Sequence, residues 1–288
     1  MSLGLFVITI LNALSSASIL ILCALGLAVI FGMMGIINVA HGEFIMLGAY
    51  ATFVFTHLLS LNIWLSMILG ALAVGVVGIA IERAVIARLY GRPLDTLLVT
   101  WGLSLALVQV VRLIFGPQAQ FLSLPLVSSI TLAGVTFPVY RLVLVVLAIL
   151  VVVLLLWLFK YTDFGIDARA VIEDPSTAAS MGIDTSRMYM LTFGIGAALA
   201  GLAGAVLSPL LNVDPTMGQK LIVRAFLVVV VGGAEILSGT VASGTFLGAV
   251  DSYVSYLTTP YFGSVALLAM AILLIRFRSG GIFARNKE

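Results

Sequence analysis

Long apolar runs dominate the chain, and short polar segments separate them. A membrane-spanning helix needs about 20 consecutive, mostly apolar residues. Runs close to this length or longer occupy residues 3–32, 44–60, 63–81, 96–115, 142–159 and 188–211. Shorter runs occupy residues 221–233, 241–257 and 265–275, and glycines break the chain between the first two of these. The pattern predicts an all-α polytopic transmembrane helix bundle of roughly eight spans, with broken or re-entrant helices among them.

Composition supports this prediction. Hydrophobic residues make up 62% of the 288 residues and charged residues only 9%, and the mean hydropathy is +1.25. Soluble domains are typically about half apolar and about a quarter charged. So few charges cannot cover a water-facing surface, which excludes a soluble globular domain. Cys23 is the single cysteine, so a disulfide framework within the chain is also excluded.

Ten of the 14 Lys and Arg residues fall into three groups, and residues 1–81 contain no Lys or Arg. The groups are Arg83, Arg88 and Arg92; Lys160, Arg169 and Arg187; and Arg276, Arg278, Arg285 and Lys287. Short loops rich in Lys and Arg stay on the cytoplasmic side of a membrane. We therefore place these three segments inside and the N-terminus outside. Residues 116–138, which suit a hairpin, and residues 212–220 are then expected on the outer side.

The first apolar run is longer than one bilayer crossing requires. This length predicts a helix that is tilted or broken near Ser15 and Ser16. The run has no basic segment before it and no small-residue cleavage site followed by a polar chain, so we expect a retained span and not a removed signal.

A polar interruption at residues 35–43 contains Asn38, His41 and Glu43 next to Gly42. Ionisable residues at membrane depth are costly and usually face the bundle interior or a water-filled path. Two interpretations stay open: a polar solute path, or hydrogen bonds that hold helices together. His41 and Glu43 alone do not make a metal site, because His-x-Glu without further ligands is a weak metal signal.

The most polar segment, residues 162–184, contains two expected short helices. The first is expected from about Ile166 to Ile172. The second begins near Pro175 with Asp174 as its N-cap, and Gly182 ends it. These helices are too short and polar to span a membrane. They either dock on a partner or simply connect two spans, and the residues alone favour a connection.

A third polar group contains Arg224 and Glu235, which need partners or water at membrane depth. Eleven residues of straight helix would separate them by about 16 Å, so they should not pair directly. The glycines around Gly232 lack a Gly-Lys-Ser/Thr ending, so the chain itself should bind no ATP. No HExxH or paired-aspartate motif supports an intramembrane enzyme.

Four stretches together resemble the membrane permease subunits of bacterial ABC importers for branched-chain amino acids, amides and urea. They are residues 26–50, 162–184, 191–209 and 225–250, in the order found in that family. The resemblance implies one transmembrane permease domain over residues 1–288, located in the bacterial inner membrane. It implies no catalysis and no cofactor on this chain, with ATP and magnesium bound by partner subunits.

The resemblance also assigns roles to the polar segments. Residues 162–184 become a cytoplasmic coupling loop that docks on the ATPase, which overturns the preference for a simple connection. Its matching residues are Phe164, Gly165, Ala168, Arg169, Ala170, Asp174, Ala179 and Gly182. The residues that match a segment near the translocation path are Asn38, His41, Gly42 and Glu43.

The implied partners are a second related permease, expected to form a heterodimer, two ATP-binding cassette subunits, a periplasmic solute-binding protein and the lipid bilayer. No nucleic-acid partner is expected. Residues 94–102 and 218–223 lean toward the urea branch, whereas Lys220 and Arg224 depart from it, so a urea-specific permease is one alternative. From other classes, a passive channel for a small neutral solute would need no coupling loop, and a proton-coupled transporter would need buried carboxylates.

Overall fold

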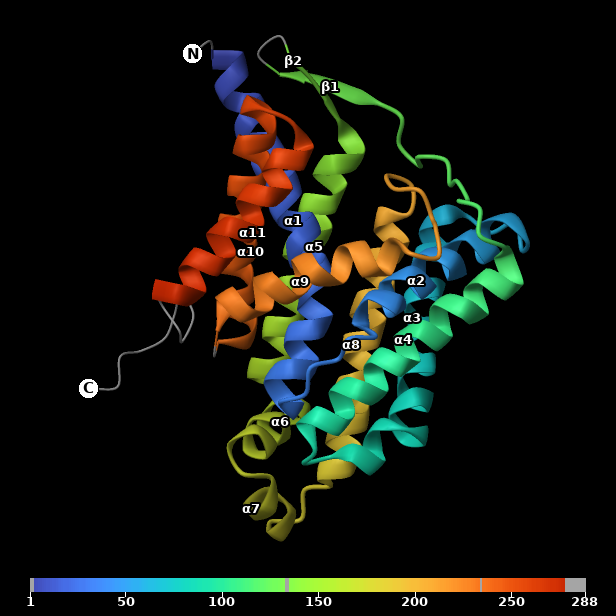
Figure 1. Cartoon of the computed structure of the whole chain (residues 1–288), viewed down its shortest axis with the longest axis vertical. Coiled ribbons are helices and arrows are strands. Elements are labelled where there is room, and N and C mark those ends of the chain that lie inside the picture. Colours follow the sequence, from blue (N-terminus) through green and yellow to red (C-terminus); the bar gives the residue numbers. More distant parts are fainter. Residues whose placement is uncertain (1–2, 133–134, 234, 278–288) are drawn as a thin grey trace. The chain divides into compact units, whose positions relative to one another are not determined.

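The computed structural model describes residues 3–132, 135–233 and 235–277 (Figure 1). The described helices are α1 (Leu3–Met34), α2 (His41–His57), α3 (Ile63–Ala84), η1 (Ile86–Leu89), α4 (Pro93–Phe115), α5 (Val139–Tyr161), α6 (Asp163–Glu173), α7 (Pro175–Ser180), α8 (Thr185–Leu207), α9 (Met217–Gly232), α10 (Ile236–Leu257) and α11 (Pro260–Phe277). The predicted all-α class is confirmed. Arg278, Arg285 and Lys287 of the third basic group lie outside the described residues.

Six of the described helices are long and apolar enough to cross a membrane: α1, α3, α4, α5, α8 and α11. The pair α9 and α10 is bent by 117° and adds a seventh span if it is counted as one. The predicted number of roughly eight is therefore slightly high. Helix α2, predicted as a span, has only 17 residues and is not among the six. Helices α9 and α10, predicted as two spans, count together as at most one. This pair confirms the expectation of a broken or re-entrant segment.

Helix α1 runs without interruption through Ser15 and Ser16, so the predicted break is absent. The hydroxyl of the nearby Ser18 donates to the carbonyl oxygen of Leu14 at 2.8 Å, on its own helix, whereas Oγ of Ser15 has no hydrogen-bond partner among the described residues. Serine is compatible with a helix interior, so its presence alone does not require a break. The 32 residues of α1 instead form one long helix.

Local sequence explains where several helices begin. The backbone N–H of Trp64 donates to Oδ1 of Asn62 at 2.9 Å, which caps α3. Pro93 occupies the first turn of α4, where its missing N–H costs nothing. Asp184 caps α8 by accepting from the backbone N–H of Arg187 at 3.0 Å.

The segment between α4 and α5 contains the expected hairpin. Strand β1 (Ser129–Leu132) pairs antiparallel with strand β2 (Val135–Pro138), with Ile130 opposite Phe137. Phe137 is buried, whereas neighbouring Thr136 and Pro138 are exposed. This alternation is the period-two pattern of a strand with one covered face.

The described chain divides into two compact units. Unit 1 contains the described residues within 1–24, 124–152 and 224–288, and unit 2 contains residues 25–123 and 153–223. The prediction of one transmembrane domain over residues 1–288 stays a prediction. In unit 1, α9 and α10 are joined by the Ser243 hydroxyl, which donates to the carbonyl oxygen of Val228 at 2.6 Å.

In unit 2, small residues bring α2, α3 and α8 close together. A β-carbon on Gly48 of α2 would overlap the backbone of Gly201 on α8. A β-carbon on Gly78 of α3 would overlap the side chain of Ala197 on α8. Small residues at such crossings allow helix backbones to approach closely, which is a common way to pack helices in membranes. This packing fixes α2, whose first turn carries the predicted path residues.

Candidate functional site

The predicted path residues lie where α1 gives way to α2. Residues 35–40 form the connection, and His41, Gly42 and Glu43 form the first turn of α2. The exposed fractions of Asn38, His41 and Glu43 are 0%, 0% and 1%. An acidic residue in the first turn of a helix is favoured by the helix dipole. The structure therefore brings all the predicted path residues into one buried polar segment.

Helix α4 supplies the polar partners of this segment. The hydroxyl of Ser104 donates to Oε1 of Glu43 at 2.6 Å. The backbone N–H of Val39 donates to the hydroxyl oxygen of Thr100 at 3.2 Å. Thr96, Thr100 and Ser104 are buried and follow each other at intervals of four residues, so they share one face of α4. Sequence reasoning missed Thr100 and Ser104, although this spacing of hydroxyls in an apolar helix could have indicated them.

Three polar atoms of the segment have no hydrogen-bond partner among the described residues. They are Oε2 of Glu43 and both side-chain atoms of Asn38, Oδ1 and Nδ2. A buried polar group without a partner costs about 1–3 kcal/mol of stability, and more when it is charged. Such groups in native proteins commonly have a functional reason. These atoms are therefore candidates for binding a polar solute.

Gly42 brings the first turn of α9 against the first turn of α2. A β-carbon on Gly42 would overlap the carbonyl oxygen of Gly218, and a β-carbon on Gly218 would overlap that of Gly42. The β-carbon on Gly218 would also lie 2.6 Å from Oε2 of Glu43. Glycine at both positions thus allows the two helices to cross directly beside the Glu43 carboxylate.

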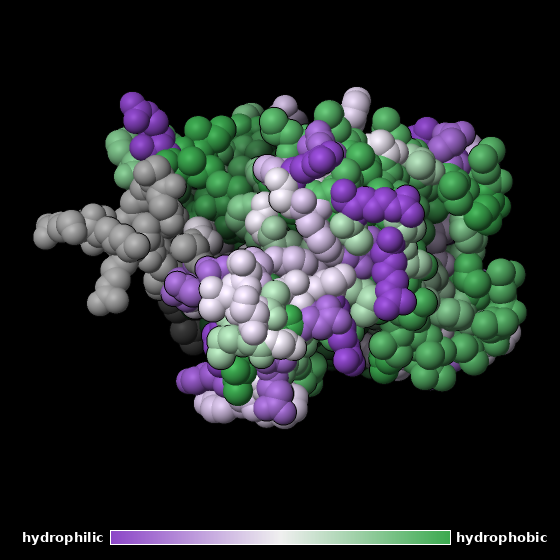
Figure 2. Space-filling model, turned by 90° about the horizontal axis from the view of Figure 1, so that it is seen from below, coloured by the Kyte–Doolittle hydropathy of each residue, from purple (hydrophilic) through white to green (hydrophobic). Residues whose placement is uncertain are grey.

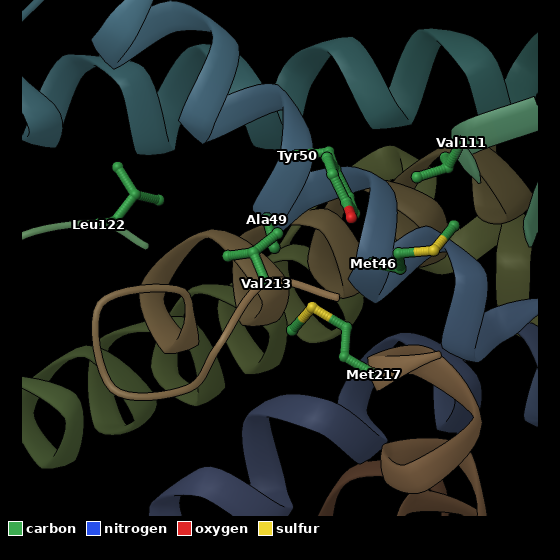
Figure 3. Packing of buried hydrophobic residues seen from close by; sticks show 7 residues of the cluster. All are labelled: Met46, Ala49, Tyr50, Val111, Leu122, Val213 and Met217. Carbon is green, nitrogen blue, oxygen red and sulfur yellow. The ribbon is translucent and has the colours of Figure 1, made fainter. Parts of the chain in front are cut away.

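An apolar cluster joins α2 to the two loops predicted outside the membrane. It comprises Met46, Ala49, Tyr50, Val111, Leu122, Val213 and Met217 (Figure 3). The backbone of Val213, a member of this cluster, also exchanges hydrogen bonds of 2.9 and 3.0 Å with the backbone of Gln120. These contacts hold the segment after α4 and the segment before α9 together in unit 2.

An ion pair organises the start of α9. Nζ of Lys220 donates to Oδ2 of Asp214 at 3.0 Å, and the backbone N–H of Thr216 donates to Oδ1 at 2.8 Å. Partial burial alone would raise the pKa of Asp214. Hydrogen bonds from Thr216 and Lys220 and the charge of Lys220 outweigh burial, and they hold the pKa below its usual value. Lys220 lies on α9, whereas we expected it in a loop.

The two helices predicted in the coupling loop are present as α6 and α7. Oδ1 of Asp174 accepts from the backbone N–H groups of Ser176 and Thr177 at 2.9 and 3.2 Å, which confirms Asp174 as an N-cap. Gly182 has a φ of +91°, and the N–H groups of Gly182 and Ile183 bond back to the end of α7. This αL glycine ends the helix as predicted. Helix α6 is longer than expected because it begins at Asp163.

The coupling loop is attached to the ends of three long helices. Ala168, Val171 and Ala178 are buried against Met33 of α1 and Met188 of α8. The guanidinium of Arg169 donates to the carbonyl oxygen of Phe159 at the end of α5, and a β-carbon on Gly165 would overlap the same carbonyl. The Phe164 ring packs on that of Phe159 with centroids 5.9 Å apart.

The predicted coupling residues divide into two groups by exposure. Gly165 and Ala168 are buried, and Phe164 and Ala170 are half-buried, so these four seat the loop on the helix ends. Arg169, Asp174, Ala179 and Gly182 are exposed. Sequence reasoning missed three exposed apolar side chains in the same loop: Ile166, Ile172 and Met181, with exposed fractions of 57%, 38% and 78%. Figure 2 shows hydrophilic side chains gathered near the middle of the face seen from below, with apolar surface beside them.

Arg224 and Glu235 bind different partners, as the helix geometry predicts. Nη2 of Arg224 donates to the hydroxyl oxygen of Ser264 on α11 at 2.6 Å. Glu235 precedes α10 and accepts from the hydroxyl of Ser238 at 3.0 Å.

Comparison with known proteins decides the family. A family model described as the permease component of branched-chain amino acid transport systems matches residues 9–275. The chain belongs to this permease family. It is 31% identical to the high-affinity branched-chain amino acid transport system permease protein LivH of Salmonella typhimurium over 294 residues, covering 95% of this chain and 94% of LivH. No solved structure gives a significant match.

Two further relatives are also permeases of branched-chain amino acid transport. The permease is 29% identical to the high-affinity branched-chain amino acid transport system permease protein BraD of Pseudomonas aeruginosa, covering 95% and 94% of the two chains. It is 28% identical to the probable LivH of Methanocaldococcus jannaschii, covering 88% and 82%. The resemblance inferred from the sequence is confirmed. The chain is a multi-pass inner-membrane permease component of a transport system.

Proposed function

We propose that this permease forms the membrane path of an ATP-driven importer for branched-chain amino acids or related small polar solutes such as amides and urea. Among these solutes, branched-chain amino acids are the first candidates, because the names of LivH and BraD refer to branched-chain amino acid transport. A periplasmic binding protein delivers the solute to the outer loops, and a second related permease completes the path. Two ATPase subunits bind ATP and magnesium, and this chain binds neither.

The attachment of the coupling loop is the observation that carries this proposal. Helices α6 and α7 are packed by one apolar cluster on the ends of α1, α5 and α8. Because protein interiors are close-packed, displacement of the loop is transmitted to the helices that it contacts. Ile166, Ile172 and Met181 of the same loop stay exposed. Exposed apolar side chains on short helices suit a groove on a partner.

The experiment compares two exposed apolar residues in different loops. Met181→Asp places a charge on the coupling loop, and Val127→Asp places one in the segment before the β1–β2 hairpin. Their exposed fractions are 78% and 85%, so neither change should disturb packing. The measurement is retention of the ATPase subunits during purification of the tagged permease, followed by ATP-dependent solute uptake in proteoliposomes.

The Met181→Asp variant should retain fewer ATPase subunits and take up less solute, because docking would bury the new carboxylate away from water. Val127→Asp should retain the ATPase subunits at the wild-type ratio. Equal retention and equal uptake in both variants would contradict the proposed coupling.

A further inference from the structure

Glu43 and Asn38 provide hydrogen-bonding atoms that unit 2 itself does not use. Ser104 occupies only Oε1 of Glu43, and Oε2 has no partner among the described residues. Neither Oδ1 nor Nδ2 of Asn38 has a partner there. Both side chains are at least 99% buried, with exposed fractions of 1% and 0%. Buried polar groups without a partner in native proteins commonly have a functional reason.

These side chains belong to one short stretch of chain. The backbone N–H of His41 donates to the carbonyl oxygen of Asn38 at 3.2 Å, which ties Asn38 to the first turn of α2. Glu43 lies in the same turn. Its free oxygen faces the first turn of α9, since a β-carbon on Gly218 would lie 2.6 Å from it. The free oxygen of Glu43 therefore lies beside the place where α2 and α9 cross, and Asn38 directly precedes the same turn.

The chemistry of the free atoms selects the ligand. An ionised carboxylate only accepts hydrogen bonds, and Oδ1 of an asparagine is also an acceptor. Acceptors of this kind suit a group with several N–H donors. An ammonium group has three such donors and a primary amide has two. The free Nδ2 of Asn38 adds one donor group beside these acceptors on the chain.

We propose that Oε2 of Glu43 and the side chain of Asn38 bind the nitrogen end of the transported solute. The recognised chemistry is an N–H donor group, which an amino-acid ammonium, an amide and urea share. This inference rests on the proposed function, because it assumes that the solute passes through this permease. The Gly42–Gly218 crossing covers Oε2 in this structure, so the solute reaches it when α9 moves away from α2.

The test uses the complete complex in proteoliposomes. The wild type is first tested with labelled leucine, acetamide and urea, and the solute that it accumulates is used for the variants. Glu43→Gln removes the charge and Asn38→Ala removes the amide. Glu82→Gln is the matched control. Glu82 is also 1% exposed, its Oε1 accepts a hydrogen bond from the Tyr90 hydroxyl, and its Oε2 likewise has no partner among the described residues.

Glu43→Gln and Asn38→Ala should each lower uptake about tenfold or more. ATPase activity stimulated by the loaded binding protein should stay within about twofold of wild type, because the coupling loop is intact. If Glu43→Gln fails to assemble, Asn38→Ala carries the same comparison. Glu82→Gln should match the wild type in both measurements.

Charge then separates the two kinds of nitrogen group. For an ammonium, Glu43→Asp should retain more uptake than Glu43→Gln, because it keeps the carboxylate. For acetamide or urea, Glu43→Gln should retain more, because its amide oxygen still accepts a hydrogen bond.

Two failures are distinguishable. If the wild-type complex accumulates none of the three solutes with ATP, the proposed function fails and this inference fails with it. If the wild type transports and both variants match Glu82→Gln, the inference alone is overturned.

Discussion

Gly42 of α2 and Gly218 of α9 contact each other through their backbones, because a β-carbon on either would overlap the carbonyl oxygen of the other. The contact lies beside the Glu43 carboxylate. Next to it, Met217 of α9 packs in the apolar cluster with Met46 and Ala49 of α2. Separation of the two first turns would therefore break both the backbone contact and this side-chain packing.

Gly218→Ala should disrupt this crossing. The added methyl group meets backbone, which cannot turn aside, so α9 must shift. Overpacking of this kind costs about 1–3 kcal/mol, and we expect an apparent melting temperature several degrees lower in detergent, together with reduced uptake. Gly102→Ala is the control, because a β-carbon there meets nothing within 4 Å. Equal melting temperatures for both variants would show that the crossing is looser than described.

Ser104→Ala should destabilise the permease through Glu43. The change removes the hydroxyl that donates to Oε1 and leaves the buried carboxylate less satisfied, at a cost of about 1–3 kcal/mol. Thr245→Ala serves as the control, because its exposed hydroxyl bonds only within α10. Thermal unfolding of both variants checks this. A melting temperature for Ser104→Ala at or above that of Thr245→Ala would argue against the hydrogen bond.

Gly182→Ala should uncouple ATP hydrolysis from uptake. The residue has a φ of +91°, which costs a residue with a β-carbon about 1 kcal/mol or more, so the end of α7 should distort. Gly116 has a φ of +81° and lies after α4, so Gly116→Ala imposes similar strain outside the coupling loop. The measurement is solute transported per ATP hydrolysed. We expect a several-fold decrease for Gly182→Ala alone, and an equal decrease in both would assign the effect to general strain.

The two helices of the proposed coupling loop could be predicted from the sequence because the signals that bound them are local. Asp174, Pro175 and Gly182 each specify a helix boundary through atoms within a few residues. The partners of Glu43 could not be predicted in the same way. Ser104 is 61 residues away and is brought to Glu43 only by the packing of α4.

The number of spans illustrates the same limit. Apolar runs gave the approximate positions of the long helices, since burial in lipid depends on length and hydropathy. They did not show that α9 and α10 meet at a bend of 117°. The apolar runs also did not show that α1 is continuous through its serines. Whether a helix bends at such a position depends on its contacts with other helices. The resemblance assigned residues to the proposed coupling loop, but the structure was needed to separate buried residues such as Ala168 from exposed ones such as Met181.

Acidification should weaken the start of α9 through Asp214. The folded structure lowers the pKa of Asp214, so its ionised form contributes stability at neutral pH. That contribution is lost as pH falls through the lowered pKa, at the acidic end of the carboxyl range. In Asp214→Asn the contribution is absent at every pH. Melting temperatures measured from neutral to acidic pH should therefore converge for wild type and variant, and a constant difference would contradict the assignment.

ATP-dependent uptake in proteoliposomes tests the central claim most directly. We predict that labelled leucine accumulates only when this permease is assembled with its partner permease, the ATPase subunits, ATP and the loaded binding protein. Proteoliposomes that contain this chain alone should show no uptake above that of empty liposomes. Equilibration of leucine, acetamide or urea by the chain alone, without ATP, would contradict the account and indicate a passive channel.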